Sequence, residues 1–143
     1  LFEEIKEGIS PFLENRPFVL ALPDADMRIT ADRFHLKNVL FNIIDNAIKY
    51  NDKESTEVVV GYQHSSETQT IKIGDNGCGI SKEHIEQVFS KFYRVPTGNI
   101  QRTRGFGLGL FYVKKVMDAH LGQVRIDSIP GKQTFIQLSF PKK

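Results

Sequence analysis

This sequence lacks several features that would point directly to a function. Its 143 residues contain one cysteine, Cys78, so no disulfide bond can form within the chain. Such sparse use of cysteine is typical of a reducing compartment. No apolar run approaches the roughly 18 residues that would suggest a membrane-spanning helix. The formal net charge is +2 and the basic residues do not form one long run, so the composition gives no reason to propose a nucleic-acid partner.

What remains is the composition of an ordinary globular domain. Hydrophobic residues make up 40% of the chain and charged residues 25%, as in typical soluble proteins. We therefore predict one domain over residues 1–143. The chain begins Leu-Phe-Glu-Glu, without an initiator methionine or a signal-peptide pattern, which leads us to expect a fragment of a longer protein.

Apolar periodicity predicts an α+β fold in which helices cover one face of a mixed sheet. Helices are expected at residues 2–14, 32–50, 81–88 and 108–121. Asp32 precedes the helix at 32–50, Ser81 is the expected N-cap of the helix at 81–88, and Gly122 is the expected terminator of the last helix. Strands are expected at residues 18–22, 27–30, 56–62, 68–74, 123–129 and 134–140.

A glycine-rich stretch precedes the last predicted helix, where residues 105–110 read Gly-Phe-Gly-Leu-Gly-Leu. Alternate glycines let the backbone approach a ligand closely, and the following helix N-terminus offers N–H groups to an anion. The stretch is not a P-loop. It is not a Gly-x-Gly-x-x-Gly dinucleotide motif either, because Leu110 stands at the third glycine position. It belongs to another kind of nucleotide site, or to none.

The helix predicted at 32–50 carries a polar stripe beside its apolar face. Asn42, Asn46 and Lys49 recur at spacings of four and three residues, which places them on one side of the helix. Solvated faces favour Glu, Lys and Gln, whereas asparagine costs up to ~0.7 kcal/mol relative to alanine. Amide oxygens suit a Mg²⁺ ion already bound to phosphate, and Lys49 adds a positive charge. A solvated face is the alternative.

Asp75 follows the strand predicted at 68–74, in phase with the inward-facing Ile71 and Ile73. Its carboxylate should therefore point to the interior, where it needs a hydrogen-bond donor. The exocyclic amine of a purine is one candidate, and a backbone N–H or a water is another. The glycine turn that follows is weak evidence, because a plain turn has the same pattern. Cys78 within it has no basic neighbour that would activate a thiol.

Two further segments are ambiguous by themselves. Phe89–Arg94 combines aromatic and basic residues and fits either the edge of a core or a binding site. Arg102 and Arg104 fit a solvated loop, or a loop that meets a triphosphate. The histidines show no metal-ligand spacing and are better explained as ordinary surface or core residues; they are His35, His64, His84 and His120.

In combination, four segments resemble the sequence boxes of histidine kinases in both order and spacing. Asn42–Tyr50 resembles the N box, Asp75–Ile80 the G1 box, Phe89–Arg94 the F box and Gly105–Leu110 the G2 box. The resemblance covers nearly the whole chain and implies the ATP-binding catalytic domain of a two-component sensor kinase. The implied Bergerat-type fold is an α+β two-layer sandwich. About three helices cover one face of a mixed, mostly antiparallel sheet of about five strands.

The resemblance also implies roles for individual residues. Asn46 would hold Mg²⁺, Lys49 would contact phosphate, Tyr50 would stack near adenine and Asp75 would accept a hydrogen bond from the adenine N6 amine. Residues 94–107 would form a lid. The implied nucleotide-binding set is Asn42, Asn46, Lys49, Tyr50, Asp75, Gly77, Gly79, Ile80, Phe92, Arg94, Gly105, Gly107, Leu108, Gly109, Leu110 and Thr134. Two departures are Gln133, where a glycine often precedes the threonine, and the bulky Phe106.

By the same resemblance, the domain would bind Mg-ATP and donate the γ-phosphoryl group to a histidine on a separate dimerisation domain. The implied onward partner is the receiver domain of a response regulator. The implied location is the cytoplasmic part of a sensor kinase, without direct membrane contact in this fragment. No histidine of the chain lies in the His-Glu/Asp pattern followed by proline that is typical of the acceptor, so the fragment should not phosphorylate itself.

Other proteins that share this fold supply the competing functions. ATPases of the topoisomerase, mismatch-repair and chaperone types are not expected to show Phe89–Arg94 or the Gly105–Leu110 pattern in this form. Anti-sigma serine kinases lack the F box. The histidine-kinase interpretation is therefore preferred.

Overall fold

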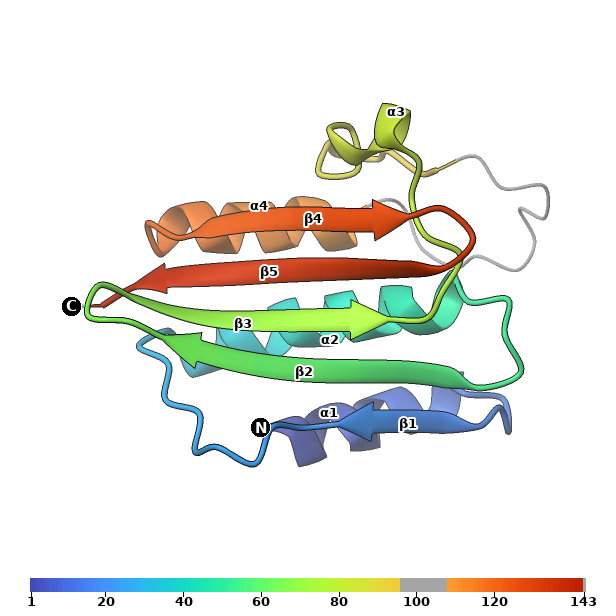
Figure 1. Cartoon of the computed structure of the whole chain (residues 1–143), viewed down its shortest axis with the longest axis horizontal. Helices are drawn as coiled ribbons and strands as arrows, with labels where there is room; N and C mark the ends of the chain where they lie inside the picture. The colour runs from blue at the N-terminus through green and yellow to red at the C-terminus, as the bar shows by residue number, and fades with distance from the viewer. Residues whose placement is uncertain (96–107, 143) are drawn as a thin grey trace.

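A five-stranded sheet forms the centre of the computed structural model, which describes residues 1–95 and 108–142 (Figure 1). The strand order is β1-β2-β3-β5-β4. β1 (Phe18–Ala21) runs parallel to β2 (Thr56–His64). β3 (Thr68–Asp75) is antiparallel to both β2 and β5 (Gln133–Pro141), and β5 is also antiparallel to β4 (Gln123–Ile129). The sheet is therefore mixed and mostly antiparallel, as the sequence predicts.

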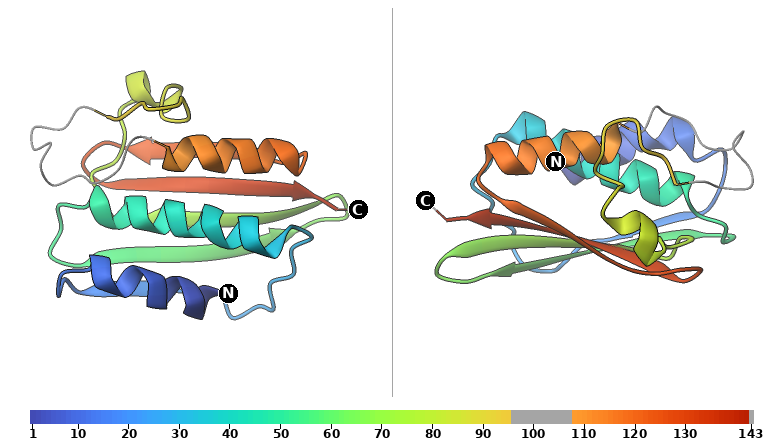
Figure 2. Two further views of the ribbon diagram at one scale, coloured as in Figure 1. Left: turned by 180° about the vertical axis from the view of Figure 1, so that it is seen from behind. Right: turned by 90° about the horizontal axis from the view of Figure 1, so that it is seen from above.

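The long helices all lie on one face of this sheet, as the view from above in Figure 2 shows. They are α1 (Phe2–Ile9), α2 (Arg33–Lys49) and α4 (Gly109–Ala119). A 3-10 turn at Ser10–Phe12 continues α1, with Pro11 near its start. The predicted two-layer α+β sandwich is confirmed.

The core fills the space between these two layers. Every second residue of β5 from Thr134 to Phe140 is buried, because successive side chains on a strand point to opposite faces. α2 supplies a continuous apolar face to the same core, including Val39, Leu40 and Ile43. At one end of the sheet, polar residues take over these inward positions. Asp75 ends β3, and Thr134 lies beside it near the start of β5.

The strand predicted at 27–30 is wrong, because this segment forms no ladder with the sheet. Side chains satisfy its backbone instead. Gln69 accepts a hydrogen bond from the Thr30 N–H at 2.9 Å and donates one to the Arg28 carbonyl at 2.7 Å. The Tyr62 hydroxyl donates to the same carbonyl at 2.8 Å. A segment whose backbone groups are satisfied in this way does not need a neighbouring strand.

Two helix ends also differ from the prediction. α3 spans only Lys82–Ile85, and its N-cap residue Ser81 makes no capping hydrogen bond; the Ser81 hydroxyl instead donates to the Glu83 carboxylate at 3.3 Å. At the end of α4, Leu121 and not Gly122 adopts the left-handed conformation, with φ 55°. Gly122 is required for space, since a Cβ there would lie 2.6 Å from the Ser139 carbonyl oxygen.

Candidate functional site

A cavity of about 340 Å³ opens at the end of the sheet where the polar inward positions lie. It is bounded by the C-terminal half of α2, the end of β3, the start of β5 and the N-terminus of α4. Its size matches ligand sites of roughly 300–1,000 Å³. The lining residues are Asn42, Ile43, Asn46, Ala47, Lys49, Tyr50, Asp75, Cys78, Gly79, Ile80, Val88, Tyr93, Arg94, Val95, Leu108, Gly109, Leu110, Thr134 and Ile136.

The asparagine stripe of α2 faces this cavity. The Asn42 side-chain nitrogen donates to the Asn38 carbonyl oxygen at 2.8 Å, which fixes the orientation of the amide. Its oxygen then lies beside the start of α4, where a Cβ on Gly109 would come within 3.1 Å of it. The glycine thus allows α2 to approach the end of α4 that carries unpaired N–H groups and a positive dipole. This pairing of amide oxygens with a helix N-terminus suits an anionic ligand that carries a metal ion.

Lys49 belongs to the same wall and is held by a neighbour on its own helix. Its Nζ lies 2.7 Å from the Asp45 carboxylate, and each side chain is about 15% exposed or less. This ion pair keeps the ammonium group at the cavity, because the two residues are four positions apart on one face of the helix. A bound anion would share Lys49 with Asp45.

Asp75 supplies the acidic group of the opposite wall. Burial raises the pKa of its carboxyl to about 6, and a hydrogen bond from the Gly77 N–H, at 2.8 Å, partly opposes that rise. The inward orientation predicted from the strand phase is confirmed, since Asp75 lines the cavity. Burial makes the ionised form costly, so a ligand that donates a hydrogen bond to Asp75 gains more than it would at the surface.

The turn after Asp75 is tightly fixed against two other segments. The Cys78 N–H donates to the Tyr50 carbonyl at 2.9 Å, and the Cys78 carbonyl accepts from the Gly131 N–H at 2.5 Å. Gly79 has φ +72°, and a Cβ there would lie 2.3 Å from the Ile129 carbonyl oxygen. Gly77 leaves no room for a side chain either, since a Cβ would be 2.7 Å from the Tyr50 carbonyl oxygen. The glycines therefore let the turn pack between the end of α2 and the β4–β5 hairpin.

Gly79→Ala is expected to be more destabilising than Gly131→Ala. Both glycines have φ above +70°, but a Cβ on Gly131 would meet nothing within 4 Å. The control variant should therefore lose only the roughly 1–2 kcal/mol of left-handed strain, whereas Gly79→Ala must also push the hairpin away from the cavity. Thermal and urea denaturation of both variants measure the difference. Equal losses in the free energy of unfolding would mean that the turn can move away from the hairpin without destabilising the fold.

Most of the predicted site residues meet at this cavity. The α2 helix and the residue that follows it contribute Asn42, Asn46, Lys49 and Tyr50. The start of α4 and the residue before it contribute Leu108, Gly109 and Leu110. Asp75, Gly79, Ile80, Arg94 and Thr134 complete the set that the sequence analysis and the structure share. Gly77 lies just behind the lining and holds Asp75 through its N–H.

Among the predicted residues that the structure describes, Phe92 is the other one, besides Gly77, that is not part of this lining. Phe92 has φ 65°, and its side chain is 63% exposed and does not line the cavity. Gly105 and Gly107 lie outside the described residues, as does most of the predicted lid at 94–107.

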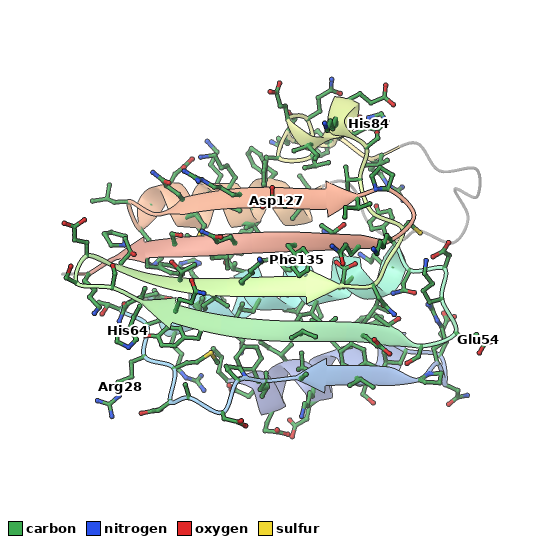
Figure 3. All side chains as sticks on the ribbon, viewed as in Figure 1. Arg28, Glu54, His64, His84, Asp127 and Phe135 are labelled. Atoms are coloured by element: carbon green, nitrogen blue, oxygen red, sulfur yellow. The ribbon has the colours of Figure 1, made fainter. Side chains whose placement is uncertain are left out.

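Several lining residues were not predicted. Tyr93 lines the cavity, whereas the predicted Phe92 beside it does not. The Tyr93 hydroxyl is hydrogen-bonded to His84 of α3, which is labelled in Figure 3. Cys78 also lines the cavity; burial and the neighbouring Asp52 raise the pKa of its thiol. The sequence signal for Tyr93 was its position inside the aromatic segment. The apolar lining residues follow the same periodicity as ordinary core residues, so the sequence alone does not mark them as part of a site. They are Ile43, Ala47, Val88, Val95 and Ile136.

Comparison with protein families supplies the decisive observation. Residues 31–143 match the model described as histidine kinase-, DNA gyrase B- and HSP90-like ATPase, which is most of the chain. The chain belongs to this ATPase family. The matched region contains every residue that lines the cavity, so the cavity is the nucleotide-site candidate of a domain in this family.

Relatives of this chain include proteins named as sensor proteins and one named as a sensor histidine kinase. The sensor protein RprX of Bacteroides fragilis is 48% identical over 101 residues, covering 70% of this chain and 20% of that protein. The sensor histidine kinase WalK of Bacillus subtilis is 36% identical over 143 residues, covering 99% of this chain and 22% of that protein. The chain thus spans about a fifth of the length of these relatives.

A solved structure has the same fold. The mycobacterial sensor histidine kinase MprB superimposes with a TM-score of 0.76 at 26% identity, over 98% of this chain and 94% of that chain. Within residues 1–95 and 108–142, no helix is long and apolar enough to cross a bilayer.

Proposed function

We propose that this domain binds Mg-ATP and donates the γ-phosphoryl group to a histidine on a separate phosphoacceptor domain in two-component signalling. The observation that carries the proposal is the convergence of the asparagine stripe, Asp75 and the α4 N-terminus on one cavity of an ATPase-family domain. The relative named as a sensor histidine kinase favours the histidine acceptor.

The adenine end of the site would lie between Asp75 and Tyr50. The Asp75 carboxylate can accept from the exocyclic amine of adenine, while the Tyr50 ring and Ile80 offer apolar surface to the base. The turn that Gly77 and Gly79 pack against the β4–β5 hairpin keeps this part of the cavity in shape before the ligand arrives. Preorganisation of this kind lowers the entropy that binding would otherwise lose.

The phosphate end would lie between α2 and the start of α4. Asn46 would hold Mg²⁺ and Asn42 would lie near it, and neutral amide oxygens are suitable ligands for an ion that keeps most of its coordination to phosphate and water. When bound, the ion would neutralise charge on the phosphate oxygens. Lys49 and the N-terminal N–H groups of α4, which have no acceptor within the helix, would hold the phosphate chain in place.

In the proposed transfer, the histidine ring nitrogen of the acceptor attacks the γ-phosphorus and the bond to the β–γ bridging oxygen breaks. ADP leaves with the electron pair of that bond. This domain would contribute mainly positioning and charge stabilisation, which account for most of the catalysis in phosphoryl transfer. The acceptor domain of the parent chain and the receiver domain of a response regulator are the proposed partners.

Titration calorimetry with ATP, with and without Mg²⁺, tests the binding half of this proposal. The transfer half is tested by adding γ-labelled ATP together with a separately expressed dimerisation domain that carries the acceptor histidine. Label should appear on that domain only when this chain is present, and this chain alone should stay unlabelled. Saturable ATP binding with steady phosphate release and no labelled protein would instead favour an ATPase function.

ATP affinity is expected to fall as the pH drops through about 6, where Asp75 becomes protonated. An amine donor binds the ionised carboxylate, so binding must release the proton, and the affinity should approach a tenfold loss for each pH unit below the pKa. Phosphate groups also titrate near pH 6. The same titration on Asp75→Asn therefore serves as the control. The steeper pH dependence of the wild-type chain is the contribution of Asp75, and parallel curves would remove Asp75 from the adenine site.

A further inference from the structure

One row of polar side chains crosses three strands at the adenine end of the cavity. Asp75 on β3 pairs with Thr134 on β5, and Thr134 pairs with Ser128 on β4. Directly paired residues of antiparallel strands project to the same face. Asp75 and Thr134 line the cavity, whereas Ser128 lies one strand further away and outside the lining.

The Ser128 hydroxyl makes three short contacts. It accepts a hydrogen bond from the Ile80 N–H at 2.7 Å, lies 2.9 Å from the Gln133 carbonyl oxygen, and lies 2.9 Å from the Thr134 hydroxyl oxygen. Ile80 and Thr134 both line the cavity. Ser128 thus connects the turn after Asp75, through Ile80, with Thr134 in the wall of the cavity.

The single proton of Ser128 determines the direction of these bonds. A carbonyl oxygen can only accept, so the contact with Gln133 is a hydrogen bond only if Ser128 donates to it. The contact with Thr134 is then a hydrogen bond only if Thr134 donates to Ser128. This is the one arrangement that places a proton in every contact. It leaves the lone pairs of the Thr134 hydroxyl free to face the cavity.

We propose that Ser128 is a positioning residue for base selection, which directs the Thr134 hydroxyl so that it presents an acceptor beside the Asp75 carboxylate. An exocyclic amine carries two hydrogens and can satisfy both acceptors, directly or through a water. A 6-oxo purine presents a carbonyl there, which would face two acceptors and leave them unpaired. The inference rests on the proposed function, since it takes adenine as the base at Asp75.

The test compares ATP with inosine triphosphate, whose base carries a 6-carbonyl in place of the amine. In Ser128→Ala, Thr134 keeps its hydroxyl but loses the acceptor that held its proton, so it becomes free to donate into the cavity. We expect the preference for ATP over inosine triphosphate to fall about 5-fold or more, the change expected from one hydrogen bond. ATP should bind more weakly, while inosine triphosphate should bind as well as before or better. Purely structural damage would weaken both nucleotides and leave the ratio unchanged.

Three companion variants separate the causes. Ser139→Ala is the matched control and should keep the wild-type ratio. The Ser139 hydroxyl makes a similar cross-strand contact, with the Thr70 hydroxyl of β3 at 3.2 Å, and neither residue lines the cavity. Ser128→Thr retains the hydroxyl and should also keep it. In a Thr134→Val background, Ser128→Ala should have no further effect on the ratio. If Ser128→Ala does not fold, Thr134→Val alone must lower the ratio by a similar factor.

An unchanged ATP preference in folded Ser128→Ala, or an undiminished effect of that substitution in the Thr134→Val background, overturns the role of Ser128 while the ATP site stands. If the wild-type chain binds neither nucleotide, the proposed function itself fails, and the inference fails with it. The two failures are therefore distinguished by the wild-type titration.

Discussion

Asp75→Asn should weaken ATP binding by about 3- to 10-fold while making the ligand-free domain more stable. The loss follows from replacing a charge-assisted hydrogen bond, of about 1.5–3 kcal/mol, by a neutral one. The selection of adenine should weaken with it, because an amide can turn its NH₂ group towards a 6-carbonyl. Calorimetric titration with ATP and GTP measures both effects.

The gain in stability follows from the pKa of Asp75, which burial raises from 3.8 to about 6. Protonation in the folded state therefore stabilises the chain fully below the unfolded pKa, and this contribution is lost as the pH rises through 6. At pH 7.5 the folded chain holds a costly charge, and asparagine removes it while keeping an oxygen for the Gly77 N–H. We expect about 1–2 kcal/mol, below the roughly 3 kcal/mol that the pKa difference corresponds to, because the cavity is open to water.

Asp127→Asn is the matched control for Asp75→Asn. Asp127 lies on the edge strand β4, which β5 separates from the strand of Asp75, and its side chain is exposed. Figure 3 labels this residue. The same chemical change there should alter neither the melting temperature nor ATP affinity by a measurable amount. If Asp75→Asn behaves like this control, Asp75 is not the group that receives the base.

Asn46→Ala should lower Mg²⁺-dependent ATP affinity by about tenfold or more, while the fold stays intact. The substitution removes one neutral oxygen ligand at the phosphate end, a contact worth ~1–3 kcal/mol when it is charge-assisted. Alanine is also the better helix former, so the free energy of unfolding should not fall. Titrations with and without Mg²⁺ separate the metal contribution from that of the base.

Asn38→Ala controls for the change in helix propensity, since Asn38 lies on the same helix but does not line the cavity. It should bind Mg-ATP like the wild-type chain. Wild-type affinity and metal dependence in Asn46→Ala would mean that the asparagine stripe of α2 is only a solvated face.

The elements that sequence analysis predicted well are those in which local pattern and tertiary packing agree. The apolar stripe of α2 and the alternation of β5 each follow one period, and the polar stripe and the phase of Asp75 could be derived from the same periods. The segment 27–30 was wrongly predicted as a strand because its apolar and polar side chains alternate as they do in strands. Whether it joins the sheet was determined by Gln69, 39 residues from Thr30.

The remaining features depend on contacts between distant segments, which no local pattern encodes. Phe92 and Tyr93 are adjacent, and the backbone at Phe92, with φ 65°, determines which ring reaches the cavity. Ser128 falls in none of the four boxes, because its contacts arise only when β4, β5 and the turn after Asp75 meet. The space required at Gly122 likewise depends on Ser139.

The strand order also bears on how the domain is made. β5 is the last strand in the sequence, yet it lies between β3 and β4 (Figure 1). During synthesis β3 therefore emerges with one edge unpaired, and that edge stays unpaired until β5 has also left the ribosome. Such an open edge is prone to pairing with other chains. The cavity also lacks Thr134 until β5 is made. Nucleotide binding can therefore stabilise the domain only once the sheet is complete, and it cannot stabilise a chain that ends before β5.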